Sequence, residues 1–279
     1  MAITTEKKSS PLVTILLPHY KTPELAKLCL RSLKMHTDLS RIKVLAVDND
    51  SGGESLDYLR SVKWISLIEL KDVAGEEPAA MHAKALDAGM QSVDTPYVLS
   101  IHTDTIVTDD GWLDFLIGKI EQSDKIAGVG SWKLEYVSPL KRFGKVIEEF
   151  LQQWIWFPLT GRKRSGIIGT GDNYYYLRSH CAMYRTELIR KYTMGFFDEG
   201  QTAGKVIHRK LVENGFRMIF IEPHELSRYM KHLNHATMIL NPEIAGKKTG
   251  TKKSYDRIMR ELKSVQYDKI LNDNSLDLK

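Results

Sequence analysis

The chain has 279 residues, of which 42% are hydrophobic and 27% charged, and its formal net charge is +5 at pH 7. This composition is typical of a soluble globular protein with one large or two small domains, and it excludes a disordered or fibrous chain. Two cysteines are too few for a disulfide framework, which favours a reducing compartment. Residues 1–10 are polar and unlike a signal peptide, and no apolar run approaches the ~20 residues of a membrane span. We therefore expect a cytoplasmic protein that is at most peripheral on the inner face of a membrane.

Strands and helices alternate through the first half of the sequence. Residues 12–17 form an apolar run that Pro18 ends, and the phrase Thr22-Pro23-Glu24 is typical of a helix start. Such alternation predicts an α/β fold with a mostly parallel, Rossmann-like sheet and helices on both faces. Further strands are expected over 44–47, 64–69 and 217–221 and in a run ending at 102–104, and helices over 54–62, 76–91, 112–120, 143–157, 202–214 and from 254 onward, with a Gly-rich loop over 165–172.

Polar residues follow several of the predicted strands. His102 and Asp104 come after a short apolar run and are two residues apart, so both side chains leave the same face. Asp48 and Asp50 follow the second strand, where a carboxylate can accept hydrogen bonds from a ribose or a base; the alternative is a turn before Gly52-Gly53. Ligands bind at the carboxyl ends of strands in open α/β sheets, and a carboxylate there can hold a cation that in turn holds a diphosphate. The sequence thus indicates nucleotide-sugar chemistry.

Several other classes of site are disfavoured. The first strand leads into Pro18-His19-Tyr20-Lys21 and not into G-x-G-x-x-G, and the chain contains neither a P-loop nor a G-x-S-x-G elbow. Cys29 and Cys181 lack metal-ligand spacing. Basic residues cluster near 141–142, 162–164 and 247–253, but no aromatic residues interleave with these runs as nucleic-acid binding would require. No nucleic-acid partner is expected, and the basic clusters suit solvated surface, an anionic substrate or anionic lipid headgroups.

An ordered set of motifs resembles the GT-A glycosyltransferases of family 2, over about residues 11–236. In that family one strand ends in a Pro-x-Tyr-like turn, a second in V-D-(D/N)-x-S and a third in D-x-D. The matching segments here are VTILLPHY at 13–20, VLAVDNDS at 44–51 and YVLSIHTD at 97–104, followed by CAMYR at 181–185, GFFDE at 195–199 and ENGFR at 213–217. The resemblance implies a GT-A fold that binds a nucleoside-diphosphate sugar.

The resemblance also implies roles for individual residues. Pro18 and Tyr20 would line the base pocket, and Asp48 with Asp50 would contact the base or ribose. His102-Thr103-Asp104 stands at the D-x-D position, with Asp104 as the carboxylate that meets a divalent metal, Mn²⁺ or Mg²⁺. His102 replaces the first Asp of that motif. Because imidazole can ligate Mn²⁺ but suits Mg²⁺ poorly, His102 is a metal ligand or, alternatively, a contact to ribose or phosphate.

A late histidine often completes the metal site in this family. The phrase Lys231-His232-Leu233-Asn234-His235 supplies two, of which His232 aligns better and His235 is the reserve. A single histidine is more often structural than a ligand, and the pair in the expected region raises the metal interpretation. We therefore expect Asp104, His232 and His102 to form the metal site.

The catalytic base departs from the family pattern. Inverting members place an acidic pair one helix before the turn that is Gly215-Phe216-Arg217 here, and counting back reaches Ala203-Gly204, which has no acid. The nearest carboxylates are Asp198 and Glu199, and Asp172 on the Gly-rich loop is a third candidate; Asp198 could instead cap the following helix. A base must come within hydrogen-bond reach of the acceptor hydroxyl, so all three stay candidates.

The segment from Lys141 to Arg164 carries four aromatic residues, Phe150, Trp154, Trp156 and Phe157, between basic ends. It could lie on a membrane near a lipid-linked acceptor, although packing in a core or along an acceptor site is the more common role of such residues.

Together these observations predict a metal-dependent, inverting glycosyltransferase. It would move a sugar from a UDP- or dTDP-sugar to a glycan or lipid-linked acceptor in the synthesis of a surface polysaccharide. The alternatives are a non-catalytic nucleotide-sugar-binding module and a sugar-nucleotide nucleotidyltransferase. We expect a disordered N-terminus over 1–10, one domain over 11–240 with its nucleotide-sugar half at 11–130 and its acceptor half at 131–240, and a helical tail over 241–279.

Overall fold

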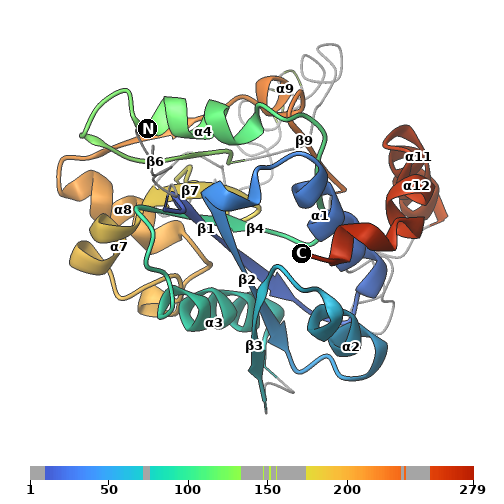
Figure 1. Cartoon of the computed structure of the whole chain (residues 1–279). Helices are drawn as coiled ribbons and strands as arrows, with labels where there is room; N and C mark the ends of the chain where they lie inside the picture. The colour runs from blue at the N-terminus through green and yellow to red at the C-terminus, as the bar shows by residue number, and fades with distance from the viewer. Residues whose placement is uncertain are drawn as a thin grey trace, which may run out of the picture.

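A mixed sheet lies at the centre of the computed structural model, which describes residues 10–71, 76–132, 174–233 and 252–279 and the single residues 147, 151, 155 and 236. Its strands are β1 (Val13–His19), β2 (Ile42–Asn49), β3 (Ser66–Leu70), β4 (Tyr97–Ile101), β6 (Ile126–Gly130), β7 (Cys181–Arg185) and β8 (Arg217–Phe220). They form a seven-stranded sheet in the order β3-β2-β1-β4-β7-β6-β8 (Figure 1). β7 runs antiparallel to β4 and β6, and the other pairs are parallel. The mostly parallel α/β fold predicted from the sequence is therefore confirmed.

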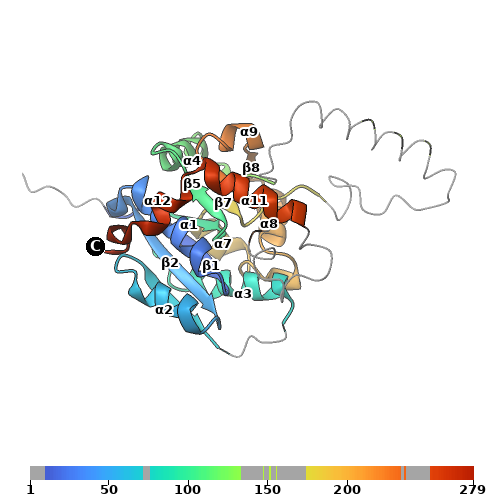
Figure 2. The ribbon, with the colours of Figure 1, turned by 90° about the vertical axis from the view of Figure 1, so that its right-hand side faces the viewer.

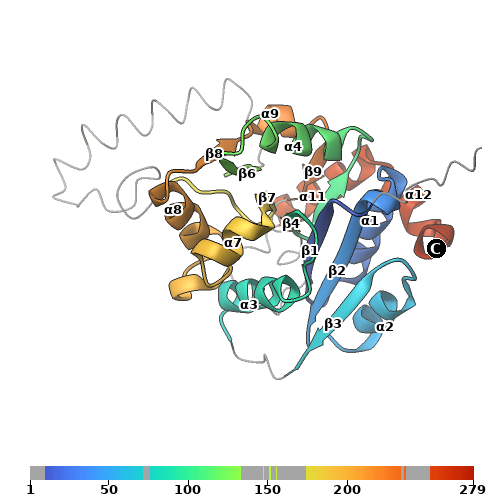
Figure 3. The ribbon, with the colours of Figure 1, turned by 60° about the vertical axis from the view of Figure 1, so that its left-hand side comes forward.

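Helices cover both faces of this sheet (Figure 3). Alternate residues of β1 face opposite sides, as the pleat requires, and each side is apolar because the sheet is buried on both. Ile15 and Leu17 pack in one core, and Leu16 packs in the other. The first core is shared with α1 (Pro23–Met35), α2 (Gly53–Ser61) and α4 (Trp112–Ile120), and the second with α3 (Pro78–Met90), α7 (Thr186–Tyr192) and α8 (Lys205–Glu213).

The structure adds elements that the sequence did not predict, and it extends β1. Pro18 does not end β1, which continues to His19 beside β2; β4 pairs only as far as Leu16, so Pro18 has a single neighbouring strand and its missing N–H is tolerated. β6 contains Gly128 and Gly130, and a Cβ on Gly130 would lie 2.3 Å from the carbonyl oxygen of Cys181. Only glycine fits where two strands lie this close. Because glycine is uncommon inside strands, these positions did not indicate a strand in the sequence.

A second, two-stranded sheet holds residues 230–232 beside the residues that follow β4. It pairs β5 (Thr105–Val107) antiparallel with β9 (Met230–His232), which follows the short helix α9 (Pro223–Leu226). Thr105 lies opposite His232, and the backbone N–H of Leu233 donates to the carbonyl oxygen of Asp104 at 2.8 Å. Residues about 130 positions apart in the sequence are thereby held side by side.

The C-terminal segment packs against α1 (Figure 2). It comprises α11 (Lys252–Ser264), α12 (Tyr267–Asn272) and the short 3-10 helix η4 (Asn274–Asp277). The helix predicted from residue 254 onward is confirmed and begins two residues earlier. Ile258 and Leu262 of α11 share an apolar cluster with Leu25 of α1 and with Ile106 and Leu233. The C-terminal helices thus pack against β5 and against the end of β9, beside the turn that follows β4.

The Gly-rich loop predicted over 165–172 lies outside the described residues, as do Asp172, His235 and all of the helix predicted over 143–157 except residues 147, 151 and 155. The division of the chain at residues 10, 130 and 240 stays a prediction. Within the described ranges, every helix is too short or too polar to cross a membrane.

Candidate functional site

The predicted nucleotide-binding residues lie at the carboxyl ends of β1 and β2. Pro18 is buried within β1, and Tyr20 follows it, half-buried. Asp48 and Asp50 follow on from the neighbouring strand; Asp48 is 1% exposed, whereas Asp50 is exposed and has a left-handed backbone with φ of 58°. Since β1 and β2 are adjacent and parallel, the four residues are gathered at one edge of the sheet.

Asp48 is braced by the loop after β1. Its Oδ1 lies 2.8 Å from Nδ1 of His19, and its Oδ2 accepts a hydrogen bond from the backbone N–H of Ser51 at 2.9 Å. Burial raises the pKa of Asp48, but the hydrogen bonds from His19 and Ser51 outweigh it and hold the pKa below its usual value. The carboxylate therefore stays ionised and ties the two strand ends together.

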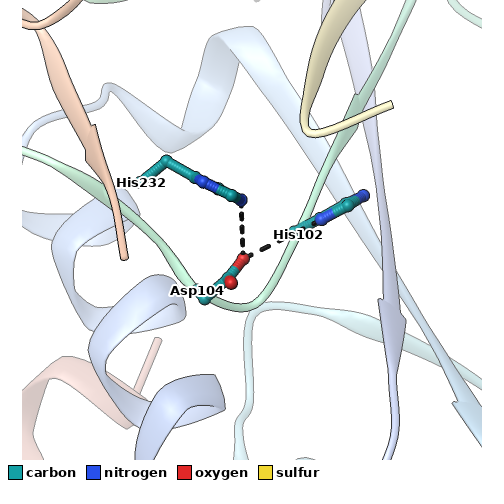
Figure 4. A group of neighbouring side chains, drawn as sticks. All are labelled: His102, Asp104 and His232. Carbon is teal, nitrogen blue, oxygen red and sulfur yellow. Dashed lines mark ion pairs between the residues drawn. The ribbon is translucent and has the colours of Figure 1, made fainter. Parts of the chain in front are cut away.

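A second cluster forms where β4 ends. His102 and Asp104 lie on the turn after β4, and His232 reaches them from β9 (Figure 4). Oδ1 of Asp104 lies 3.1 Å from Nε2 of His232 and 3.8 Å from Nδ1 of His102. One potential ligand atom from each of the three residues lies within 4.8 Å of the others. The structure thus brings together the three residues that were predicted to bind a metal, and Thr103, 4% exposed, lies buried between His102 and Asp104.

The electrostatics of this cluster favour a cation. Asp104 is 3% exposed, and its burial raises the pKa of the carboxyl; the neighbouring His232, His102 and His180 more than compensate and hold that pKa well below its usual range. Burial and the nearby His232 and His102 keep the pKa of His180 well below its ordinary value. An ionised carboxylate with imidazole nitrogens around it is a donor set that a divalent ion can use.

The spacing of the ligand atoms also fits a metal. Ligands at about 2.1 Å from an ion lie about 3 Å apart when they subtend a right angle, and further apart at tetrahedral angles. The separation of 3.1 Å between Asp104 and His232 falls in this range, and the separation of 3.8 Å between Asp104 and His102 is wider than the roughly 3.4 Å of a tetrahedral pair. One carboxylate with two imidazoles suits Mn²⁺ and later transition metals better than Mg²⁺, which prefers oxygen.

Three further residues at this site were missed from the sequence: His82, Ser179 and His180. Ile101 of β4 pairs with Cys181 of β7, so the residues just after β4 lie beside those just before β7. Oγ of Ser179 lies 2.9 Å from Nε2 of His82 and 3.1 Å from Nε2 of His102. The apolar run that begins at Cys181 was a signal for a strand, and treating it as one would have placed Ser179 and His180 at this edge.

The two described candidates for the catalytic base are held in ion pairs. Oδ2 of Asp198 accepts from the backbone N–H of Met194 at 2.9 Å and from Nζ of Lys210 at 2.8 Å. Burial raises the pKa of Asp198, and these partners lower it below its usual value. Glu199 is more exposed and pairs with Arg209 at 2.6 Å. Asp198 does not cap the following helix, because α8 begins after Gly204.

Gly204 explains why the expected acidic pair is missing. It has a φ of 84°, and a Cβ at this position would lie 2.7 Å from the carbonyl oxygen of Leu177 and 3.2 Å from the hydroxyl of Tyr184. Side chains are strained at this φ, and the backbone oxygen cannot move aside without the segment that leads into Ser179. Ala203 is 2% exposed in the apolar core. Neither position can hold a solvated carboxylate in this fold.

Comparison with known proteins identifies the family. The model described as Glycosyl transferase family 2 matches residues 14–193. The chain belongs to this family. The match confirms the resemblance drawn from the strand-end motifs, and the chain is a glycosyltransferase with a GT-A fold.

Solved structures show the same fold at low sequence identity. The mannosyltransferase PcManGT from Pyrobaculum calidifontis, in complex with GDP-Man and Mn²⁺, is 16% identical with a TM-score of 0.53, and the match covers 76% of this chain and 55% of that one. TarS 1-349 from S. aureus is 15% identical with a TM-score of 0.52, over 92% of this chain and 72% of that one. TarS 1-349 in complex with UDP-GlcNAc is 14% identical with a TM-score of 0.53, over 93% and 70%. No curated protein matches the sequence. These likenesses support the fold alone, and the chain spans about half the length of PcManGT.

Proposed function

We propose that this glycosyltransferase moves a sugar from a UDP- or dTDP-sugar to a hydroxyl of a glycan or lipid-linked acceptor, with a divalent metal and with inversion, in the synthesis of a surface polysaccharide. The observation that carries the proposal is the cluster of Asp104, His102 and His232 at the same sheet edge as Tyr20 and Asp48. A metal ligand set beside polar residues at the carboxyl ends of neighbouring strands is what binding of a nucleoside diphosphate requires. The neighbour PcManGT, crystallised with GDP-Man and Mn²⁺, pairs a donor with a metal in the same fold.

Separate groups of residues are proposed to hold the metal ion and to bind the nucleoside of the donor. Asp104, His102 and His232 would hold the ion, which when bound stabilises negative charge on the leaving diphosphate as a Lewis acid. Tyr20, after the buried Pro18, would pack against the base, and the carboxylates at the end of β2 would accept hydrogen bonds from base or ribose. The acceptor hydroxyl forms the new bond to the anomeric carbon as the bond from that carbon to the diphosphate oxygen breaks, and the hydroxyl proton passes to a base.

Three carboxylates are proposed for that base. Glu199 has the most exposed carboxylate of the two that the structure describes, since 47% of its side chain is accessible against 1% for Asp198. Asp198, held by Lys210 and the Met194 N–H, is better placed to fix the loop before α8. Asp172 lies outside the described residues and is tested by substitution together with the other two.

A cytoplasmic location beside a membrane would suit a lipid-linked acceptor. The support is in the sequence, where basic residues flank the aromatic segment of residues 141–164. Anionic headgroups attract such clusters at low ionic strength.

A donor panel tests the proposal. Release of the nucleoside diphosphate is measured from UDP-, dTDP- and GDP-sugars with Mn²⁺, for the parent protein, for Asp104→Asn and for the exposed control Asp110→Asn. We expect release from UDP- or dTDP-sugars, and a loss of about 10²-fold or more in Asp104→Asn alone, because the metal site then lacks its anionic ligand.

The same panel separates the alternatives. A nucleotidyltransferase would release pyrophosphate from a nucleoside triphosphate and a sugar phosphate, and a binding module would bind donor without releasing the diphosphate. Either result, or equal rates for Asp104→Asn and the parent protein, would contradict the proposal.

A further inference from the structure

The hydroxyl of Ser179 bridges two histidine rings beside the metal ligands. It lies 2.9 Å from Nε2 of His82 and 3.1 Å from Nε2 of His102, and Ser179 is 8% exposed. The two rings meet edge to face, with centroids 4.6 Å apart and an interplanar angle of 74°. His82 comes from α3 and Ser179 from the turn before β7, so separate parts of the fold converge on His102.

Two proton arrangements satisfy every group of the bridge. A serine hydroxyl has one proton and two lone pairs, so it could accept from both rings, but among the described residues its own proton would then have no acceptor. All three groups are satisfied when the hydroxyl donates to one ring nitrogen and accepts from the N–H of the other. In the first arrangement Nε2–H of His102 donates to Ser179, and the hydroxyl donates to an unprotonated Nε2 of His82. In the second, both directions are reversed, and the neutral His102 ring then carries its proton on Nδ1.

Metal binding selects between them. Nδ1 is the His102 nitrogen that faces Asp104, at 3.8 Å from Oδ1, so it is the atom placed to join the ligand set. A ligating nitrogen must be unprotonated, and metal-bound histidines donate their other N–H to a partner that fixes the ring. The first arrangement satisfies both conditions, and the second prevents ligation by His102.

We infer that Ser179 and His82 are positioning residues that hold His102 as a metal ligand, through a relay in which His102 donates to Ser179 and Ser179 donates to His82. This inference rests on the proposed function, because it assumes that Asp104, His102 and His232 bind a metal. The relay would be needed because His102 stands where the family has an aspartate, and a histidine there binds a metal only in one tautomer. An ionised carboxylate can bind a metal through either oxygen. A neutral imidazole has only one unprotonated nitrogen, so its tautomer decides whether the nitrogen that faces the metal can bind it.

Affinity for Mn²⁺ alone, without nucleotide, is the first test. Titrations followed by the electron paramagnetic resonance signal of free Mn²⁺ compare the parent protein with Ser179→Ala and His82→Phe. His82→Phe keeps a ring against His102 but removes the acceptor nitrogen. We expect the dissociation constant to rise about 10- to 100-fold in both, as for other partners of metal-bound histidines. Ser179→Thr keeps the hydroxyl and should restore affinity, and Ser61→Ala, on α2, is the control that should not change it.

Tautomers give a readout that loss of packing would not. With Zn²⁺ as a diamagnetic probe, ring ¹⁵N spectra of the parent protein should show His82 protonated on Nδ1 and His102 protonated on Nε2. The His82 signals, assigned from their absence in His82→Phe, should no longer respond to Zn²⁺ in Ser179→Ala.

The outcomes separate this inference from the proposed function. If the parent protein binds Mn²⁺ and both variants bind it within twofold, the relay is wrong and the metal site stands. The relay is also overturned if Ser179→Thr fails to recover affinity while His82 keeps its Zn²⁺ response in Ser179→Ala. If the parent protein does not bind Mn²⁺, the metal site fails and the relay fails with it.

Discussion

Arg31 joins the C-terminal segment to helix α1. It lies on α1 and is only 2% exposed. Its Nε donates to Oδ1 of Asp277 at 2.9 Å, Nη2 donates to Oδ1 of Asn274 at 2.8 Å, and Nη1 donates to the carbonyl oxygen of Ile270 at 3.1 Å. Tyr58 of α2 donates to the same Asp277 carboxylate at 3.1 Å. One guanidinium thus satisfies acceptors in α12 and η4 together.

Arg31→Met tests this clamp. Methionine fills much of the same apolar volume, but it leaves the Ile270 carbonyl without its donor and the Asp277 carboxylate without its cation, with Tyr58 still donating to it. Removing one partner of a buried ion pair costs about 3–5 kcal/mol, more than the loss of packing. For a chain of this size, that corresponds to a fall in Tm of about 6–20 °C, at about 2–4 °C per kcal/mol.

Urea denaturation followed by circular dichroism measures the change in the free energy of unfolding. Arg41→Met is the matched control, because the Arg41–Asp114 pair is exposed, with side-chain accessibilities of 32% and 66%. Such a surface pair contributes at most about 1 kcal/mol. A loss in Arg31→Met no greater than in Arg41→Met would refute the idea that this clamp stabilises the docked tail.

Three further predictions concern the site and its supports. Gly204→Ala should destabilise the protein by about 2–4 kcal/mol in urea denaturation, since it adds a clash with the Leu177 carbonyl to the backbone strain. Gly215→Ala has the same φ of 84° but open space around it, so only the strain of about 1 kcal/mol should appear, and equal losses would contradict the clash. Burial lowers the pKa of His208 from 6.5 to about 4, so its contribution to stability is fully present above pH 6.5 and is lost as the pH falls towards 4. Between pH 6.5 and pH 4 the free energy of unfolding should fall by up to about 3 kcal/mol more in the parent protein than in His208→Phe. Parallel pH profiles of the two proteins would contradict this role of His208. Mn²⁺ should bind at least about tenfold more tightly than Mg²⁺ by calorimetry, because two of the three proposed ligands, His102 and His232, are imidazoles, and equal affinities would contradict this ligand set.

The sheet and the proximity of His102 to Asp104 could be predicted because their signals are local or ordered along the chain. The apolar run before His102 shows a strand end, and the carboxyl ends of parallel strands share one edge. The position of His232 required the resemblance to a known family, since the pairing of β5 with β9 joins residues that are far apart in sequence. No local pattern encodes that contact.

The remaining residues of the site depend on one antiparallel strand. β7 lies between β4 and β6, and the residues before its amino end, Ser179 and His180, lie beside the turn after β4. A parallel alternation of strands and helices does not predict such an insertion. The missing acid near Gly204 was noticed in the sequence, but its cause, a backbone contact from Leu177, becomes evident only in three dimensions.

The central claim is that the cluster around Asp104 binds a metal and, through it, a nucleoside diphosphate. A thermal-shift panel tests it most directly, with UDP, dTDP, GDP and CDP, each in Mn²⁺, Mg²⁺ or EDTA, for the parent protein, Asp104→Asn and Asp110→Asn. A ligand at 100 times its Kd adds about 2.7 kcal/mol to the stability of the folded state. We expect UDP or dTDP to raise the melting midpoint with Mn²⁺ but not with EDTA, and Asp104→Asn alone to abolish the rise. A panel without any nucleotide-dependent shift, or with equal shifts in EDTA, would contradict the claim.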